Sequence, residues 1–190
     1  MTGNTKPSPS KSGRLPGDPS PDELRQRMIR INHAGEYGAV RIYAGQLAVF
    51  GKTHRLSRVV RRMEHQEQRH LKVFDDLMIE NRVRPTALAP LWHVAGFALG
   101  AATALMGEKA AMACTSAVEE VIEEHYTAQL EVLGENDRAL SETVREFRAD
   151  EVAHKQEALD HGAAETPGYT VLSGLIKGGC RAAIWLSQRL

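Results

Sequence analysis

The chain has 190 residues, enough for one domain with a sizeable hydrophobic core. Its 24 basic and 24 acidic side chains cancel to a formal net charge of zero, which argues against a nucleic-acid-binding protein, since such proteins carry a basic excess or a basic stripe. The two cysteines, Cys114 and Cys180, lie far apart and form no Cys-x-x-Cys pair, which disfavours a disulfide scaffold or a zinc site and fits a reducing compartment.

Residues 1–20 are rich in Pro, Ser, Gly and Lys and carry almost no apolar side chains, a composition typical of a disordered tail. They lack the apolar core of a secretory signal peptide. The run Ser20-Pro21-Asp22-Glu23 then combines a capping box, a proline at the first helical position and acidic residues in the first turn, which marks a helix start. We therefore expect a tail over 1–20 and a single helical domain over 21–190.

Apolar residues recur with helical periodicity through nearly all of that domain. Four helices are expected, at about 21–50, 56–82, 109–133 and 137–160. Their ends are marked by helix-breaking residues, namely Gly51, Pro85, Gly134 and Gly162. Thr166-Pro167 is expected to open a last helix that runs to Leu190. No segment predicts a strand, so the predicted fold class is all-α.

The segment from Pro85 to Gly107 contains no Asp, Glu, Lys or Arg, and residues 88–106 are about long enough to span a bilayer. A single span is disfavoured, because it would place the helices before and after it on opposite sides of the membrane. Two alternatives remain: a core helix buried on all sides, or a helix that lies partly in a membrane face. The amphipathic segment 171–190, which includes Trp185, favours the second.

Two Glu-x-x-His motifs stand out, Glu67 with His70 and Glu151 with His154. Residues three apart on a helix share a face. Each motif continues an apolar series that is spaced alternately by three and four residues, so each should face the interior of a helical bundle. A buried carboxylate without a partner is costly. Two buried pairs of this kind therefore predict a metal ion as the partner.

An internal repeat extends the set of candidate ligands. The run that starts at Tyr43 (YAGQ) resembles the run that starts at Tyr126 (YTAQ), and a glutamate, Glu36 or Glu119, stands seven residues before each tyrosine. Two helical turns place each glutamate and its tyrosine on one face. The same shift of 83 residues, with one insertion, carries the first Glu-x-x-His motif onto the second. The chain therefore predicts two helix hairpins, joined by the apolar segment as a long crossover.

This inventory matches the di-iron and di-manganese carboxylate bundles, in which two helices each supply a glutamate and two others each supply Glu-x-x-His. Four carboxylates balance two divalent ions, and carboxylate with imidazole suits iron or manganese. The competing interpretation is a set of buried ion pairs with arginines, most of which lie off the apolar faces: Arg41, Arg62, Arg69 and Arg148. Three further glutamates, Glu120, Glu123 and Glu124, compete with Glu119 as a ligand, and the repeat selects Glu119.

The predicted metal ligands, which are also the predicted catalytic residues, are Glu36, Glu67, His70, Glu119, Glu151 and His154. Glu36 and Glu119 are expected on opposite sides of the metal pair, with one of them bridging. Tyr43 and Tyr126 are candidates for contacts behind the ligands. The predicted fold is a ferritin-like four-helix bundle with an additional apolar crossover helix and a C-terminal amphipathic helix.

Three long runs closely resemble the 5-demethoxyubiquinone hydroxylase family of ubiquinone biosynthesis. They are INHAGEYGAVRIYAGQ (31–46), RPTALAPLWHVAGFALGAATALMGEKAAMACTSAVEE (84–120) and GCRAAIWLSQRL (179–190). The resemblance covers essentially residues 22–190, and the ligands of that family fall on the six residues named above. The N-terminal tail departs from the mitochondrial leaders of the eukaryotic members, which favours a bacterial protein.

The resemblance implies a membrane-associated, O₂-dependent monooxygenase with two iron ions that hydroxylates the ring of a demethoxyubiquinol intermediate. It implies reducing equivalents from NADH, directly or through a partner, and a polyprenylated quinol as substrate. We expect a peripheral protein on the cytoplasmic face of a bacterial inner membrane, bound through residues of about 88–106 and 171–190, with a homo-oligomer or a biosynthetic partner protein possible in principle and no nucleic acid.

Three rival functions remain at this stage. A ferritin-like or rubrerythrin-like bundle for iron storage or peroxide scavenging uses the same ligand types, but storage shells have polar exteriors and lack a long uncharged crossover. A di-iron hydroxylase of a modified tRNA base is disfavoured by the neutral charge. A non-enzymatic lipid or quinone carrier would hold no iron or manganese.

Overall fold

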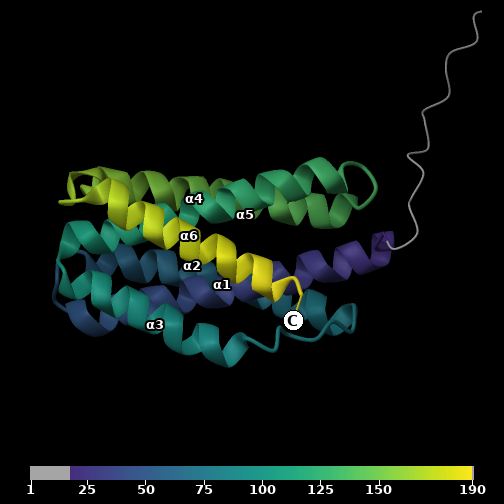
Figure 1. Cartoon of the computed structure of the whole chain (residues 1–190), viewed down its shortest axis with the longest axis horizontal. Helices are drawn as coiled ribbons and strands as arrows, with labels where there is room; N and C mark the ends of the chain where they lie inside the picture. The colour runs from purple at the N-terminus through teal and green to yellow at the C-terminus, as the bar shows by residue number, and fades with distance from the viewer. Residues whose placement is uncertain (1–17, 190) are drawn as a thin grey trace, which may run out of the picture.

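The computed structural model describes residues 18–189, which are helical almost throughout (Figure 1). The α-helices are α1 (Pro21–Phe50), α2 (Ser57–Glu80), α3 (Ala89–Leu105), α4 (Glu108–Leu133), α5 (Arg138–Asp160) and α6 (Tyr169–Ser187). A short 3-10 helix, η1 (Ala163–Glu165), precedes α6. No strand occurs within 18–189, so the all-α prediction is confirmed. The predicted tail falls almost wholly on residues 1–17, outside the described part of the chain.

The helix boundaries agree with the sequence to within two residues, except at the last helix. At the start of α1, Ser20 accepts a hydrogen bond from the Glu23 backbone N–H, and the Glu23 side chain accepts one from the Ser20 N–H, as a capping box requires. The last helix begins at Tyr169 rather than at Thr166, because Gly168 adopts a left-handed conformation with φ of 71° that interrupts the helix. It ends at Ser187 rather than at Leu190.

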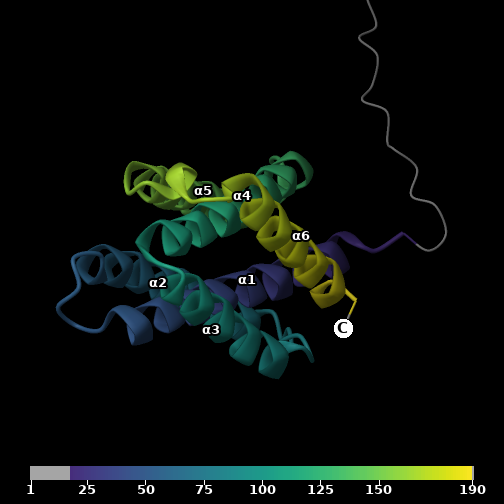
Figure 2. The same cartoon turned by 60° about the vertical axis from the view of Figure 1, so that its left-hand side comes forward.

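Two antiparallel pairs, α1 with α2 and α4 with α5, form the four-helix bundle. The crossover helix α3 runs along α1, and α6 lies along α4 and also contacts α1 (Figure 2). The additional helices α3 and α6 therefore cover the α1/α4 side of the bundle and leave α2 and α5 on the other side. This arrangement is the predicted ferritin-like bundle with a crossover helix and a C-terminal helix.

The crossover helix is not buried on all sides, which excludes one of the two alternatives for residues 88–106. Its buried residues are Gly100, Thr103 and Ala104, whereas Leu91 and Val94 are exposed. The covered face packs backbone against backbone: a Cβ atom added at Gly100 would lie 1.9 Å from the Ile42 carbonyl oxygen. Glycine is therefore required where α3 crosses α1.

Replacing Gly100 by alanine should destabilise the protein by roughly 1–3 kcal/mol, because the new methyl group meets main-chain atoms that cannot rotate away. For a chain of this length that corresponds to a fall of about 2–12 °C in Tm. Gly178→Ala is the matched control in helix α6, where nothing lies within 4 Å of an added Cβ, and it should raise Tm slightly because alanine favours the helix. Thermal denaturation followed by circular dichroism measures both, and equal Tm values for the two variants would contradict the prediction.

Candidate metal centre

The six predicted ligands meet in the interior of the bundle. Glu36 comes from α1, Glu67 and His70 from α2, Glu119 from α4, and Glu151 and His154 from α5. Each is at most 2 % exposed. The alternating apolar spacing that placed both Glu-x-x-His motifs on inward faces thus holds in three dimensions. Four separate helices bring six ionisable side chains to one place.

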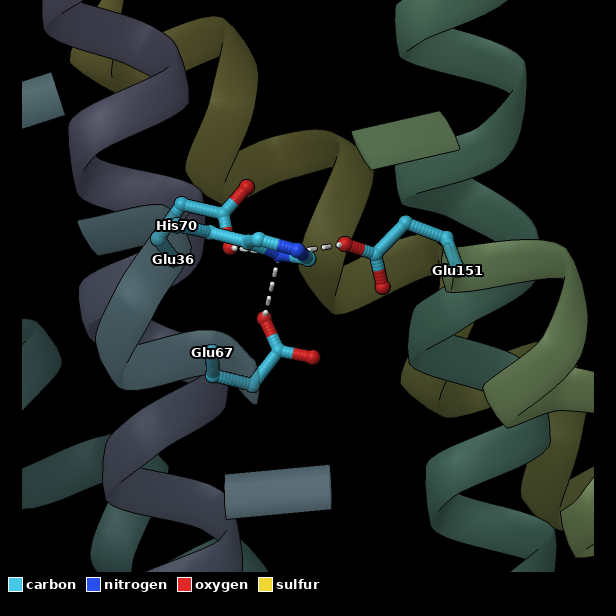
Figure 3. Close-up of side chains that lie close together, drawn as sticks. All are labelled: Glu36, Glu67, His70 and Glu151. Atoms are coloured by element: carbon cyan, nitrogen blue, oxygen red, sulfur yellow. Dashed lines mark ion pairs between the residues drawn. The ribbon is translucent and has the colours of Figure 1, made fainter. Parts of the chain in front are cut away.

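The six side chains form two overlapping groups whose ligand atoms lie within 4.8 Å of one another. One group is Glu36, Glu67, His70 and Glu151 (Figure 3), and the other contains Glu119 and His154 with the same Glu67 and Glu151. Each group is suited to one metal ion. Glu67 and Glu151 belong to both groups, whereas Glu36 and Glu119, one of which was expected to bridge, each belong to one group.

Both histidines direct the same ring nitrogen inward. The Nδ1 atom of His70 lies 3.4 Å from Glu36 Oε2 and 3.3 Å from Glu151 Oε1. The Nδ1 atom of His154 lies 2.9 Å from Glu67 Oε1 and 3.6 Å from Glu151 Oε2. Separations of about 3–4 Å between donors that all point to one spot leave room for an ion between them.

Several buried oxygen and nitrogen atoms of this cluster, which could each bind a metal ion, have no hydrogen-bond partner within the described residues. They include both carboxylate oxygens of Glu67 and of Glu151, Oε2 of Glu36 and of Glu119, and Nδ1 of both histidines. Buried polar atoms normally have hydrogen-bond partners. A buried polar atom that has none is often one that binds a metal ion or a water molecule. The donor set is carboxylate and imidazole without thiolate, which fits iron or manganese.

Two buried tyrosines cross between the halves of the bundle to hold the outer glutamates. The Tyr43 hydroxyl on α1 donates a hydrogen bond to Glu119 on α4, and the Tyr126 hydroxyl on α4 donates one to Glu36 on α1. This exchange follows the internal repeat, in which each tyrosine stands seven residues after a glutamate. Each tyrosine fixes one oxygen of the opposite carboxylate and leaves the other free for a metal ion.

Burial and mutual charge shift the proton equilibria of the cluster. Burial raises the pKa of Glu67 and of Glu119, and for Glu119 the nearby Glu151 and Glu67 charges raise it further. Burial alone would lower the pKa of His154, but the adjacent carboxylates of Glu151 and Glu67 outweigh it and raise that pKa to about 9. The metal-free cluster therefore retains protons near neutral pH, and a divalent ion would displace them.

The competing ligands and the arginines are engaged elsewhere. Glu120 pairs with Lys177 at 2.6 Å, Glu124 pairs with Arg181 at 2.8 Å, and Glu123 pairs with Lys155. These partners lie outside the cluster, so the repeat selected the inward glutamate of α4 correctly. Arg62 binds Glu157 at the surface, and Arg41 stacks on Phe97. An interpretation of the cluster as ion pairs with these arginines is therefore disfavoured within residues 18–189, and the ion pairs of the cluster join its own histidines and glutamates.

Sequence reasoning missed two residues that hold the ligand histidines from behind. The His70 Nε2–H donates to Asp150 Oδ2 at 3.0 Å, and the His154 Nε2–H donates to Gln66 Oε1 at 3.1 Å. Each acceptor directly precedes the glutamate of the opposite Glu-x-x-His motif, and that position is the signal that could have identified both. Outer hydrogen bonds of this kind fix the tautomer and orientation of a metal-binding imidazole.

An apolar cavity of about 530 Å³ lies beside the cluster, between α1, α3, α4 and α6. Its lining includes Gly35 and Val118, which directly precede the ligands Glu36 and Glu119. A hydrogen bond of 3.0 Å from Trp92 Nε1 to Ser187 Oγ joins α3 and α6 at its wall. The cavity is deep and apolar with few polar groups, as is typical of a site for a hydrophobic ligand.

Comparison with known proteins assigns the family. The family model described as ubiquinone biosynthesis protein COQ7 matches residues 23–187. The 3-demethoxyubiquinol 3-hydroxylase of Rhodospirillum rubrum is 54% identical over 177 residues, which cover 93% of this chain and 84% of that protein. The human NADPH-dependent 3-demethoxyubiquinone 3-hydroxylase, mitochondrial, is 53% identical over 168 residues (86% and 77%).

A more distant relative extends the comparison to fungi. The 5-demethoxyubiquinone hydroxylase, mitochondrial, of Saccharomyces cerevisiae is 41% identical over 180 residues, which cover 86% of this chain and 77% of that protein. The family model covers α2 to α6 in full, α1 except for its first two residues, and every residue of the buried cluster. The chain belongs to the COQ7 family of ubiquinone biosynthesis proteins.

Proposed function

We propose that this protein is a di-iron monooxygenase that hydroxylates the ring of a demethoxyubiquinol intermediate in ubiquinone biosynthesis. The observation that carries the proposal is the buried cluster of four glutamates and two histidines beside an apolar cavity, in a chain of the COQ7 family. The hydroxylase names of the relatives favour this function over iron storage or peroxide scavenging.

Glu36, Glu67, His70, Glu119, Glu151 and His154 would hold the two iron ions. Bound iron supplies the reductive activation of O₂, which side chains alone do not provide. The surrounding chain keeps bulk water away, because the cluster is nearly fully buried. Tyr43 and Tyr126 hold the outer carboxylates in place.

The substrate is proposed to enter the apolar cavity with its polyprenyl tail between α3 and α6. The cavity reaches the α1 and α4 backbone at Gly35 and Val118, beside the ligands, so a quinol ring at its inner end would face Glu36 and Glu119. Small residues of α1 in the cavity wall, among them Gly38 and Ala39, leave space for the ring. Reducing equivalents are proposed to come from NADH, directly or through a partner protein. The human relative's name indicates NADPH for that protein.

A lipid substrate requires the protein to reach the bilayer. No helix within residues 18–189 is long and apolar enough to cross a membrane. Large apolar side chains are nevertheless exposed on the two helices that flank the cavity: Leu91, Val94, Leu105 and Met106 on or beside α3, and Val171, Leu175 and Trp185 on α6. We propose peripheral attachment through this surface, on the cytoplasmic face of a bacterial inner membrane.

Val94→Glu combined with Leu175→Glu should weaken binding to vesicles of phosphatidylethanolamine and phosphatidylglycerol on the order of 100-fold, since each side chain would lose its burial in lipid. The matched control is Ile79→Glu with Val132→Glu, which adds the same charge at exposed apolar residues of α2 and α4. Sedimentation with vesicles measures both. Equal loss of binding in the two double variants would argue against the α3/α6 surface.

The proposed activity is tested with protein loaded anaerobically with two equivalents of Fe²⁺. Addition of a short-tailed demethoxyubiquinol, NADH and ¹⁸O₂ should yield a quinol with one ¹⁸O atom on the ring, detected by mass spectrometry. Protein of verified iron content that consumes O₂ without labelling the quinol would refute the hydroxylase. A shell-sized particle in light scattering, with iron accumulating beyond two ions per chain, would support the storage function instead.

A further inference from the structure

The two halves of the cluster differ at one pair of equivalent positions. In the internal repeat, the residue before each Glu-x-x-His motif is Gln66 in α2 and Asp150 in α5. Each holds the histidine of the other helix: Asp150 accepts from His70, and Gln66 accepts from His154. The repeat therefore places a carboxylate behind one ligand histidine and a neutral amide behind the other.

The donor sets of the two halves are otherwise matched. Each half has one outer glutamate, Glu36 or Glu119. The Oε1 atom of each accepts a hydrogen bond from a buried tyrosine. Both share Glu67 and Glu151, and both histidines direct Nδ1 toward the carboxylates. The charge behind the imidazole is thus the main chemical difference between the two halves.

A carboxylate acceptor makes an imidazole a stronger ligand than an amide acceptor does. The charge-assisted hydrogen bond draws the Nε2 proton toward the carboxylate and raises the electron density at Nδ1, the atom that faces the site. His70 is also held more firmly, because Phe147 stacks on its ring at 3.9 Å between centroids. The ring of His154 meets Tyr43 only edge-on, at 6.4 Å.

We infer that Asp150 and Gln66 are positioning residues that make the two metal sites unequal, so that a divalent ion fills the half that contains His70 before the half that contains His154. This inference rests on the proposed metal centre. It assigns the order of loading to two residues that themselves bind no metal and stand one position before each motif.

The test is calorimetric titration of chelator-treated protein with Co²⁺, which binds carboxylate and imidazole donors and does not react with O₂ as readily as Fe²⁺. The wild-type protein should bind two ions in two steps, the first at least about 10-fold tighter. Asp150→Asn should weaken the first step by about 10–100-fold and leave the second within a factor of about three. Gln66→Glu, which keeps the shape and adds the charge, should tighten the second step.

Asp75→Asn is the matched control. Asp75 accepts a hydrogen bond from the Nε2–H of His33 at 3.0 Å, which is an equivalent Asp–His pair outside the cluster. Loss of the Asp75 charge should change the affinity of neither binding step. Two ions bound with equal affinity, or both steps weakened alike by Asp150→Asn, would overturn the inference while leaving the metal centre standing. Protein that binds no pair of ions at all would refute the metal centre itself. Far-UV circular dichroism confirms that each variant is folded.

Discussion

Glu151→Gln should abolish hydroxylation, by on the order of 10³-fold or more, and should reduce bound iron from two ions toward none. Glu151 belongs to both groups of ligand atoms, and its two oxygens face His70 at 3.3 Å and His154 at 3.6 Å. A neutral amide removes a charge from both sites at once. Substitution of a glutamate that belongs to only one of the two groups should lower the metal content less.

Glu36→Gln provides that comparison, because Glu36 belongs only to the group with His70. It should retain about one ion per chain in elemental analysis and lose activity, since the chemistry requires the pair. Glu146→Gln, on the exposed side of the same helix as Glu151, should leave both ions and the activity unchanged. If Glu151→Gln and Glu36→Gln lost the same amount of metal, the assignment of Glu151 as a shared ligand would be wrong.

Helix content should survive these substitutions. The apolar core, rather than the Glu151 carboxylate, holds the helices together, and glutamine keeps nearly the same side-chain volume, so the substitution leaves the packing of the bundle in place. Far-UV circular dichroism of the metal-free variants should match the wild-type spectrum. Loss of metal can then be attributed to the ligand and not to unfolding.

The six residues of the buried cluster could be predicted from sequence because their pattern is local. Glu67 and His70 continue the apolar spacing of α2, and Glu36 and Glu119 follow from the repeat that also aligns Tyr43 with Tyr126. Periodicity reports which face of a helix is buried, and a charged residue on that face requires an explanation. All six residues meet in the structure for this reason.

Contacts between helices could not be predicted in the same way. The position directly before its motif marks Gln66 as a candidate, but that position alone does not show that Gln66 reaches His154, because the contact depends on how α2 and α5 lie against each other. The membership of Glu67 and Glu151 in both groups of the cluster is likewise a property of distances across the bundle. The start of α6 was missed because Gly168, with its left-handed backbone, ends the turn two residues after Thr166.

The environment of the apolar crossover could not be predicted from composition. An uncharged segment of this length is compatible with a buried helix, a membrane span or a helix on a membrane surface. The structure excludes burial on all sides, because Gly100 contacts α1 while Leu105 on the same helix is 76% exposed. Backbone contact through glycines decides which face is covered, and that information lies in the shape of the partner helix.

Removal of the metal should lower Tm by roughly 10 °C or more when the starting metal concentration is about 100 times the Kd of the weaker site. Binding at that concentration stabilises the folded protein by at least about 2.7 kcal/mol for each ion. Each kcal/mol corresponds to about 2–4 °C for a chain of this size. The stabilisation is large because four carboxylates and two imidazoles, buried together without a cation, are costly.

The Tm of the metal-free protein should also fall as pH rises from about 6.5 to 9. Burial and neighbouring carboxylates raise the pKa of Glu119, and the adjacent carboxylates of Glu151 and Glu67 raise the pKa of His154 to about 9 despite its burial. A group whose pKa is raised on folding contributes stability below its unfolded pKa, and that stability is lost as pH rises through the folded pKa. Stabilisation by metal binding should instead increase as pH rises, because the ion competes with these protons for the same ligand atoms.

The difference in Tm between metal-loaded and metal-free protein should therefore widen with pH, as differential scanning calorimetry at pH 6.5, 7.5 and 9 would measure. Glu119→Gln removes one of the buried ionisable groups, so its metal-free form should lose less stability over the same range than the wild type does. A metal-free protein whose Tm rises with pH between 6.5 and 9 would show that the cluster does not retain its protons. In that case the buried carboxylates would be stabilised by partners within the chain, and the argument for a metal ion between them would fail.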